Sequence, residues 1–380
     1  MQLRSQRRCG KRELVSAAVA ATVAVEAAQS LSPVTVPTAT AKRKKPRLSG
    51  TSIPLLDTDD SVADCDDKIL YRYPKLVPAR LLRRYKRFLA DVVLLDADEE
   101  IRPSNADDDT SDSNVVTIYC PNTGPMVGLL DDLPNARVQL SKSDDPKRKY
   151  QYTLEMIRIY NGERHVWVGV HSASANLMVQ QALRCRWFPE LGAYTRVQRE
   201  VKYAKNSRVD FVLSTTDDDD AEKYVEVKSV TLATEDASVR CAVFPDTVST
   251  RAQKHVEELM ELIRPRGDEK KKKKGKTIDK EDAAENKRPR RSLSGAIVFL
   301  VQRDDCDTFM PSLQHDPAFA KLCRQAQASG LQLLGYACRL EPNEATQTGV
   351  VRLVSSLPLH ELEQSSTAID AVSTASKRNE

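Results

Sequence analysis

The sequence lacks several patterns that identify common protein classes. Its eight cysteines include no C-x-x-C pair, and its five histidines form no cluster with them that would indicate a zinc site. No apolar run approaches the roughly 20 residues needed to cross a bilayer. There is no Walker A loop, no G-x-G-x-x-G, no G-x-S-x-G and no internal repeat. The corresponding metal-binding, membrane, nucleotide-binding and hydrolase signatures are therefore missing.

Chain length, net charge and cysteine count do not by themselves identify a function. The chain has 380 residues, enough for two domains and tails. Lys and Arg total 58 against 54 for Asp and Glu, so a net charge of +4 does not by itself indicate a nucleic-acid partner. The charges do fall in separate acidic and basic blocks. The scattered cysteines predict reduced thiols in an intracellular protein.

Residues 1–77 are predicted to be an unstructured tail with two basic blocks. Residues 1–12 are basic and are followed by an Ala/Val-rich run, as in an organellar presequence. Residues 42–47 read K-R-K-K-P-R, a compact block of the nuclear-import type. The two targeting signals conflict, and each basic block is equally well explained as a solvated run of charges. The nucleus and an organelle such as the mitochondrion therefore both stay open.

Residues 78–163 carry several short strand patterns, which predict a small barrel of the OB type. An acidic loop, residues 96–114, interrupts it. Aromatic residues interleaved with basic ones favour backbone-directed nucleic-acid binding. We expect Phe88 and Tyr152 to be barrel core. We expect phosphate contacts from six basic residues: Arg84, Lys86, Arg87, Lys147, Arg148 and Lys149.

Residues 164–360 alternate strand and helix patterns, which predict an α/β sheet with helices on its faces. Ser249 or a nearby threonine is the expected N-cap of an amphipathic helix. Gln253, Lys254 and His255 lie near the start of that helix, where backbone N–H groups favour a phosphate. Residues 264–294 read as a disordered basic insertion, and residues 361–380 as a loose tail.

The chain is organised around residues 207–229, where two β-rich runs flank an acidic turn at 217–220. Asp210 opens the first run, and Glu226 and Lys228 lie two apart on the second. Because side chains alternate along a strand, Glu226 and Lys228 share one face while valines take the other. Two carboxylates on neighbouring strands can hold Mg²⁺ beside a phosphate. The alternative is a surface hairpin with an ordinary Glu–Lys pair.

Several separate blocks of the chain resemble one known family, the sugar fermentation stimulation protein A family. These blocks are R-R-Y-K-R-F-L-A-D-V, C-P-N-T-G-P-M-V-G, P-K-R-K-Y, R-V-D-F-V, Y-V-E-V-K-S-V-T-L and F-P-D-T-V-S-T-R-A-Q-K-H. The resemblance implies an N-terminal OB-fold domain followed by a PD-(D/E)XK, restriction-endonuclease-like domain, and non-specific DNA binding. It places Asp210, Glu226 and Lys228 in the nuclease-fold motif and matches Gln253, Lys254 and His255 to a Q-K-H signature.

The sequence departs from that pattern on the helix before the core sheet, where such nucleases carry a glutamate. Here the helix has Gln180 and Gln181, with Glu200 as a candidate substitute. The long tail, the acidic loop and the basic insertion fall outside the bacterial pattern and indicate a eukaryotic homologue. Two functions stay open. One is a DNA-binding protein whose Asp210 and Glu226 bind Mg²⁺ for phosphodiester cleavage, assisted by Lys228. The other is a silent DNA-binding or regulatory protein that retains the fold.

Overall fold

The computed structural model of the chain describes residues 51–53, 65, 67–95, 114–203, 207–215, 221–236, 239–264 and 292–360. Several sequence predictions fall outside the described residues. These are both targeting blocks, nearly all of the acidic loop, the turn at 217–220, most of the basic insertion and the C-terminal tail. No helix in the described ranges has both the length and the apolarity that crossing a membrane requires.

The first domain is the OB barrel that the sequence predicts. Its sheet has the order β5-β4-β3-β6-β7-β8, and a further β5–β7 pairing between Tyr119 and Thr153 closes it. Alternate residues along these strands fill one apolar core, as a small barrel requires. The strands are β3 (Val77–Tyr85), β4 (Leu89–Leu94), β5 (Val115–Tyr119), β6 (Ala136–Lys142), β7 (Tyr152–Tyr160) and β8 (His165–Gly169).

Two details of the barrel differ from the sequence analysis. Strand β8 forms a hairpin with β7, so residues 165–169 belong to the barrel sheet rather than to the second domain. The expectation that Phe88 is core is wrong, because it sits at the β3–β4 hairpin tip with 46% of its surface exposed. Tyr152 packs half-buried against the barrel core.

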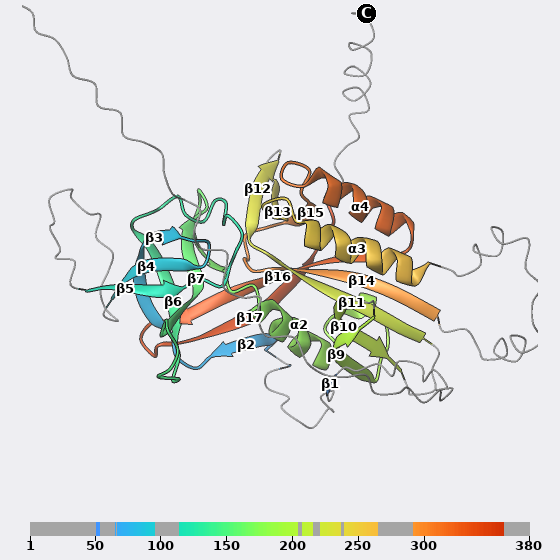
Figure 1. The fold of residues 1–380 in the computed structure, drawn as a ribbon, viewed down its shortest axis with the longest axis horizontal. Helices are drawn as coiled ribbons and strands as arrows, with labels where there is room; N and C mark the ends of the chain where they lie inside the picture. The colour runs from blue at the N-terminus through green and yellow to red at the C-terminus, as the bar shows by residue number, and fades with distance from the viewer. Residues whose placement is uncertain are drawn as a thin grey trace, which may run out of the picture. The chain divides into compact units, whose positions relative to one another are not determined.

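The second domain is built on an eight-stranded mixed sheet, in the order β1-β9-β10-β11-β14-β16-β17-β2 (Figure 1). Strand β14 is buried from Gly295 to Val301 and lies parallel to both β11 and β16, as expected of an apolar central strand. The strands are β1 (Thr51–Ile53), β2 (Ile69–Tyr73), β9 (Arg196–Lys202), β10 (Arg208–Ser214), β11 (Ala221–Val230), β14 (Ser292–Val301), β16 (Gln332–Asn343) and β17 (Thr348–Leu357).

Helices cover both faces of this sheet. Helix α2 (Ser174–Arg184) packs on one face, while α3 (Thr250–Ile263) and α4 (Pro317–Ala328) pack together on the other (Figure 1). Ser249 caps α3 as predicted, because its hydroxyl accepts a hydrogen bond from the Ala252 N–H. The remaining elements are a short 3-10 turn, η2 (Pro189–Leu191), and a small sheet of β12 (Leu232–Asp236), β13 (Val239–Phe244) and β15 (Thr308–Pro311).

Two findings correct the expectation of an unstructured tail and of reduced thiols. Strand β2 pairs with β17 and buries Ile69, Leu70 and Tyr73, so the ordered chain begins before residue 78. Cys65 and Cys185 form a disulfide that ties the chain before β2 to the end of α2. The prediction that all eight cysteines are reduced is therefore wrong for this pair. The spacing of 120 residues gave no sequence signal for it.

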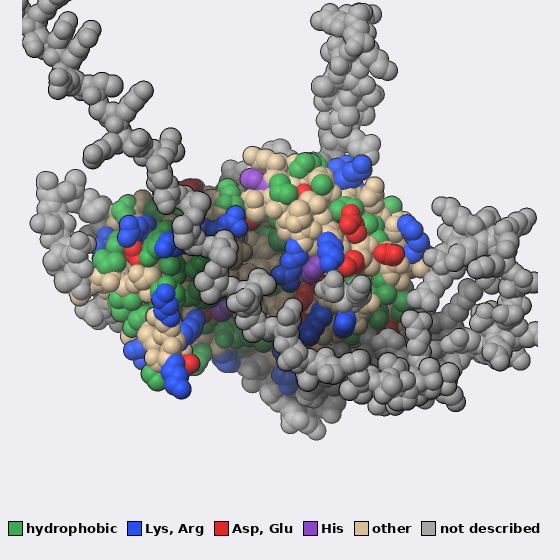
Figure 2. Space-filling model, viewed as in Figure 1, with side chains coloured by type: hydrophobic (Ala, Val, Ile, Leu, Met, Phe, Trp, Pro, Cys, Tyr) green, Lys and Arg blue, Asp and Glu red, His purple; other side chains and the backbone are tan. Residues whose placement is uncertain are grey.

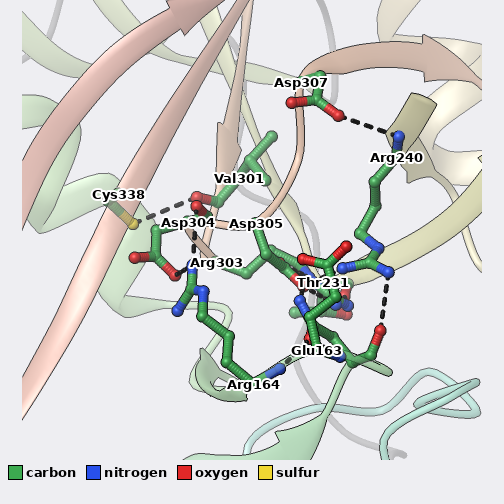
Figure 3. A network of polar contacts seen from close by, with 11 residues as sticks. Glu163, Arg164, Thr231, Arg240, Val301, Arg303, Asp304, Asp305, Asp307 and Cys338 are labelled. Atoms are coloured by element: carbon green, nitrogen blue, oxygen red, sulfur yellow. Dashed lines mark hydrogen bonds and ion pairs between the residues drawn. The ribbon is translucent and has the colours of Figure 1, made fainter. Parts of the chain in front are cut away.

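The two domains meet through a network of charged and polar side chains, in which the acidic partners Asp304 and Asp305 are buried and Arg164 is exposed (Figure 3). Arg303 donates to the two carboxylate oxygens of Asp305 through Nε and Nη2, at 2.6 and 2.8 Å. From the barrel, Arg164 donates to Asp304 at 3.0 Å, and Asn161 donates to Asp305 at 3.0 Å. Arginine neighbours outweigh the effect of burial and hold the pKa of Asp305 below its ordinary value. Charge pairing therefore contributes to fixing the barrel on the second domain.

Candidate active site

Strands β10 and β11 separate at Asp210, and this opening forms the candidate site. The register pairs Phe211 with Val225, so the next position places Asp210 across from Glu226. Residues directly opposite in an antiparallel pair lie on the same face of the sheet. The ladder ends here because the Val227 N–H donates to Asp210 Oδ2 at 2.7 Å instead of to a neighbouring strand carbonyl.

Glu226 is buried and is surrounded by cationic or hydrogen-bonding groups. Lys228 Nζ donates to Glu226 Oε1 at 2.8 Å, as the two-residue spacing on one strand allows. His255 of α3 contacts the same oxygen through Nδ1. Burial alone would raise the pKa of Glu226, but Lys228 and His255 outweigh it and lower that pKa. Glu226 therefore stays a carboxylate at neutral pH.

Asp210 has a different environment although it lies beside Glu226. Its Oδ1 accepts a hydrogen bond from Asn176 Nδ2 at 2.8 Å, in addition to the Val227 N–H on Oδ2. Burial, followed by repulsion from Glu226, raises the pKa of Asp210 to about 6. A carboxylate with an unfavourable charge at this position is the kind of group that gains from a bound cation.

Three side chains that the sequence analysis missed complete the surroundings. Asn176 comes from α2, Tyr203 from the end of β9 and Glu258 from α3, one turn after His255. Tyr203 donates to Glu258 Oε2 at 3.2 Å. Burial and the nearby Glu258, Glu226 and Asp210 carboxylates raise its pKa. The one available signal was helical spacing, because residues 255 and 258 share a helix face.

The helix position that faces Asp210 is Asn176, not either of the glutamines considered from the sequence. Gln180 accepts a hydrogen bond from Arg199 at 2.9 Å, and Gln181 contacts Cys185 and Arg184. Glu200 is opposite Asp210 in the β9–β10 register, but its φ is 54° and its side chain is exposed. Glu200 is also absent from the groups that shift the pKa of Asp210.

The donor set fits a cation that needs few protein ligands. Within the described ranges, no three His, Cys, Asp or Glu side chains converge to hold a metal ion. Asp210 and Glu226 offer carboxylate oxygens, which Mg²⁺ prefers, and Mg²⁺ commonly uses only one or two carboxylates with water and phosphate oxygens. Burial and then repulsion from Glu226 raise the pKa of Asp210, and this unfavourable charge beside a second carboxylate is the observation that favours a cation here.

The Q-K-H residues of α3 separate onto different faces. Gln253 donates to Asp316 Oδ1 at 2.8 Å, and Asp316 also caps α4, so Gln253 joins the two helices. Lys254 is exposed and lies 3.6 Å from Glu258. His255 faces Glu226. Lys254 is thus an exposed cation close to the site, and His255 is part of the site.

The basic residues of the barrel lie at two loops. Lys86 and Arg87 are exposed at the β3–β4 tip with φ of 48° and 64°, a left-handed backbone that non-glycine residues rarely adopt. Arg84 is engaged instead, donating to the carbonyls of Asn122 and Gly124 at 2.7 and 2.8 Å. In the β6–β7 loop, Lys147 and Lys149 are exposed, and Arg148 donates to Thr153 at 2.7 Å. On the face drawn in Figure 2, Lys and Arg side chains are spread over several elements rather than gathered in one patch.

Comparisons with known proteins agree with this architecture. Residues 82–170 match the SfsA N-terminal OB domain, and residues 173–269 and 287–344 match the Sugar fermentation stimulation protein RE domain. The fold and the separated strand pair thus define a barrel followed by a restriction-endonuclease-like domain. The chain belongs to the sugar fermentation stimulation protein (SfsA) family.

Curated relatives cover most of the folded chain. A sugar fermentation stimulation protein homolog of Acaryochloris marina is 41% identical over 273 residues, covering 72% of this chain and 90% of the relative. The homolog of Nostoc punctiforme is 38% identical over 287 residues, covering 75% and 98%. The solved structure of Pyrococcus furiosus SfsA in complex with Ca²⁺ aligns with a TM-score of 0.56 at 19% identity, covering 77% of this chain and 99% of that one.

Proposed function

We propose that the chain binds DNA without sequence preference and hydrolyses phosphodiester bonds at a divalent-cation site formed by Asp210 and Glu226. One observation carries the proposal: the Asp210 and Glu226 carboxylates lie across from each other where β10 and β11 separate, and burial, followed by repulsion from Glu226, raises the pKa of Asp210 to about 6. A purely structural pair at this place would instead be neutralised by partners on both sides.

Each residue has a distinct part in this proposal. Mg²⁺ held by the two carboxylates would offset negative charge that develops on the phosphate. Asn176 and the Val227 N–H fix the orientation of the Asp210 carboxylate through both of its oxygens. Lys228, held 2.8 Å from Glu226, supplies a positive charge to orient the attacking water or to stabilise the transition state. His255 fixes Glu226 from the side of α3.

The cation assignment has support from a relative. The Pyrococcus furiosus SfsA structure is described in complex with Ca²⁺. Ca²⁺ and Mg²⁺ both prefer oxygen ligands, and Mg²⁺ needs fewer from the protein. We extend divalent-cation binding to this chain and assign it to Asp210 and Glu226.

We propose that DNA contacts come from exposed cations on the barrel loops and on helix α3. Lys86, Arg87, Lys147 and Lys149 are exposed on the barrel loops, and Lys254 is exposed on α3. Arg84, Arg148 and Gln253 have internal hydrogen bonds, so their part is to position these loops and helix α3. Contacts of this kind bind phosphates and carry no sequence information. Affinity should therefore fall steeply with salt and depend little on sequence.

The test is cleavage of supercoiled plasmid and of single-stranded oligonucleotides with Mg²⁺ and with EDTA. The Glu226→Gln variant should lose at least about 10³-fold in rate, because a neutral amide is a poor cation ligand. Glu222→Gln is the matched control, since Glu222 is also a buried glutamate on β11 but bonds to the Tyr224 hydroxyl. That control should cut within about tenfold of the parent. Equal cleavage by Glu226→Gln would identify a contaminating nuclease.

A second function is favoured by a different observation. The helix residue that faces Asp210 is a neutral amide, Asn176, and Glu226 is already bonded to Lys228 and His255. Such a site fits a DNA-binding or regulatory protein that keeps the nuclease fold and cuts nothing. Salt-dependent DNA binding without cleavage by Mg²⁺, Mn²⁺ or Ca²⁺ would establish this second function in place of the first.

A further inference from the structure

A cavity of about 210 Å³ lies between the barrel loop after β5 and the end of β11. The barrel supplies Asn122, Thr123 and Gly124 to its wall, and the second domain supplies Ser229 from β11. Ser229 directly follows Lys228, so the cavity wall begins one residue beyond the candidate active site. Ser249, the N-cap of the helix that carries His255, also lines it. No part of the proposed catalytic chemistry uses this space.

The lining does not suit a phosphate. Among the described residues that line the cavity, none is Lys or Arg, and Asp246 contributes a carboxylate. Phosphate sites normally supply cations or a cluster of N–H donors. The cavity instead combines an apolar wall of Val243, Phe244 and Pro245 with hydroxyl groups such as that of Thr247. An apolar wall with polar groups at its edge matches a flat nucleobase, which has apolar faces and a hydrogen-bonding rim.

The size of the cavity also indicates a fragment of a larger ligand. Pockets for whole small molecules usually measure about 300–1,000 Å³. A space of about 210 Å³ is below that range. It suits one ring system that enters from a longer chain, while the rest of the chain remains outside on the exposed cations.

The cavity wall is fixed before any ligand binds. Met126 N–H donates to Asp246 Oδ2 at 3.1 Å, joining the barrel loop to the loop before α3. A side chain at Gly124 would meet both Asp246 oxygens at 2.9 Å, so glycine permits this close approach. Arg84 holds the same loop through the carbonyls of Asn122 and Gly124. A preformed wall lowers the cost of ordering a ligand.

We infer that this cavity takes one nucleobase of a bound DNA strand, unstacked from its neighbours, beside the phosphate at the Asp210–Glu226 site. The inference rests on the proposed function, since it assumes that a strand lies across that site. Taking a base out of the stack fixes the position of the adjacent phosphate relative to Lys228. It also favours single-stranded or unpaired DNA, whose bases leave the stack most easily.

The experiment uses the full chain and short single strands that carry 2-aminopurine, whose fluorescence rises when the base leaves its stack. Binding is measured in Ca²⁺ across a salt series, with strand integrity checked on gels. The double variant Thr123→Leu/Thr247→Leu fills the cavity from both domains with side chains that cannot stack. Both threonines are exposed, so the fold should tolerate the change. Thr195→Leu/Thr346→Leu alters two other exposed threonines as the matched control.

The parent and the control should show the fluorescence rise, and the filled variant should lose it and bind about tenfold more weakly, with an unchanged salt slope. Strand binding without any fluorescence rise, or a rise that survives filling, would overturn the cavity assignment and leave the proposed function standing. Absence of salt-dependent strand binding by the parent would overturn the proposed function, and the cavity assignment with it. Circular dichroism melting confirms that both double variants are folded.

Discussion

Two partly buried acidic groups in the same domain, Asp305 and Asp210, are partnered in opposite ways. At the domain junction, Asp305 accepts hydrogen bonds from Nε and Nη2 of Arg303 and lies near Arg240 (Figure 3). At the candidate site, Asp210 accepts only uncharged donors from Asn176 and Val227 among its described hydrogen bonds, and it faces Glu226. Arginines hold the pKa of Asp305 low, whereas burial and Glu226 raise that of Asp210. The protein neutralises the first with arginines, whereas we propose that a bound cation neutralises the second.

The largest expected effect comes from breaking the junction. Asp305→Ala leaves Arg303 buried at 4% exposure without its bidentate partner. Removing one member of a buried ion pair costs about 3–5 kcal/mol of unfolding free energy. Urea unfolding followed by circular dichroism measures this loss. A change below about 1 kcal/mol would show that other contacts hold the junction. It would refute the statement that arginine pairing makes Asp305 a stabilising group.

The second effect is a divalent-cation stabilisation that only the candidate site should provide. Saturating Mg²⁺ or Ca²⁺ should raise the unfolding free energy of the parent by about 1–3 kcal/mol, because the cation binds the folded state alone. Asp210→Asn should abolish this increment, since it removes one of the two carboxylates. Thermal melts with and without the cation measure it.

The matched control for the cation experiment is Asp305→Asn. It changes a carboxylate that already has an arginine partner, Arg303, within the protein. This variant should melt lower than the parent but gain the same increment from the cation. A full increment in Asp210→Asn would place the cation elsewhere and would end the distinction drawn between the two acids.

The surroundings of Asp210 show which contacts can be predicted from sequence patterns and which cannot. Asp210, Glu226 and Lys228 could be selected in advance because strand alternation assigns faces from spacing alone. Asn176 could not, since it lies 34 residues from Asp210 on a helix whose rotation depends on packing against the sheet. The helix pattern led to the neighbouring glutamines instead.

The same contrast holds for the fold: elements defined by neighbouring residues were predicted, and elements defined by distant partners were not. The OB barrel and the restriction-endonuclease-like sheet were predicted because short strands, turns and helix caps are local patterns, and family blocks supported them. Strand β2 was missed because its partner, β17, lies far away in the sequence, with Tyr73 paired to Gly349 and Ile69 to Arg352. Phe88 was assigned to the core because an aromatic between strands usually packs inward, yet the hairpin tip turns it outward.

The third prediction concerns pH and is smaller. The folded pKa of Asp305 lies below its unfolded value, so its charge stabilises the fold above about pH 4, and this contribution disappears as the pH falls through the folded pKa. Asp305→Asn should therefore be less stable than the parent at pH 7, and the difference should shrink as the pH falls below about 4 and through the folded pKa of Asp305. Unfolding free energies from urea titrations at several pH values measure it. A difference that stays constant with pH would mean that the Asp305 charge is not what stabilises the junction.

The smallest effect on stability is expected at Lys254. Its substitution should change DNA binding without changing the unfolding free energy. Its side chain is 52% exposed, and its contact with Glu258 is long, at 3.6 Å. Surface pairs of this kind contribute between about 0 and 1 kcal/mol, so Lys254→Ala should unfold within about 0.5 kcal/mol of the parent. If Lys254 contacts a phosphate, the slope of log affinity against log salt should fall by about one. The control is Lys321→Ala, because Lys321 is also an exposed lysine but lies on α4 rather than on α3. This variant should leave the slope unchanged. An unchanged slope in Lys254→Ala would mean that the strand does not pass along α3, and the cations of the barrel loops would then have to hold it alone.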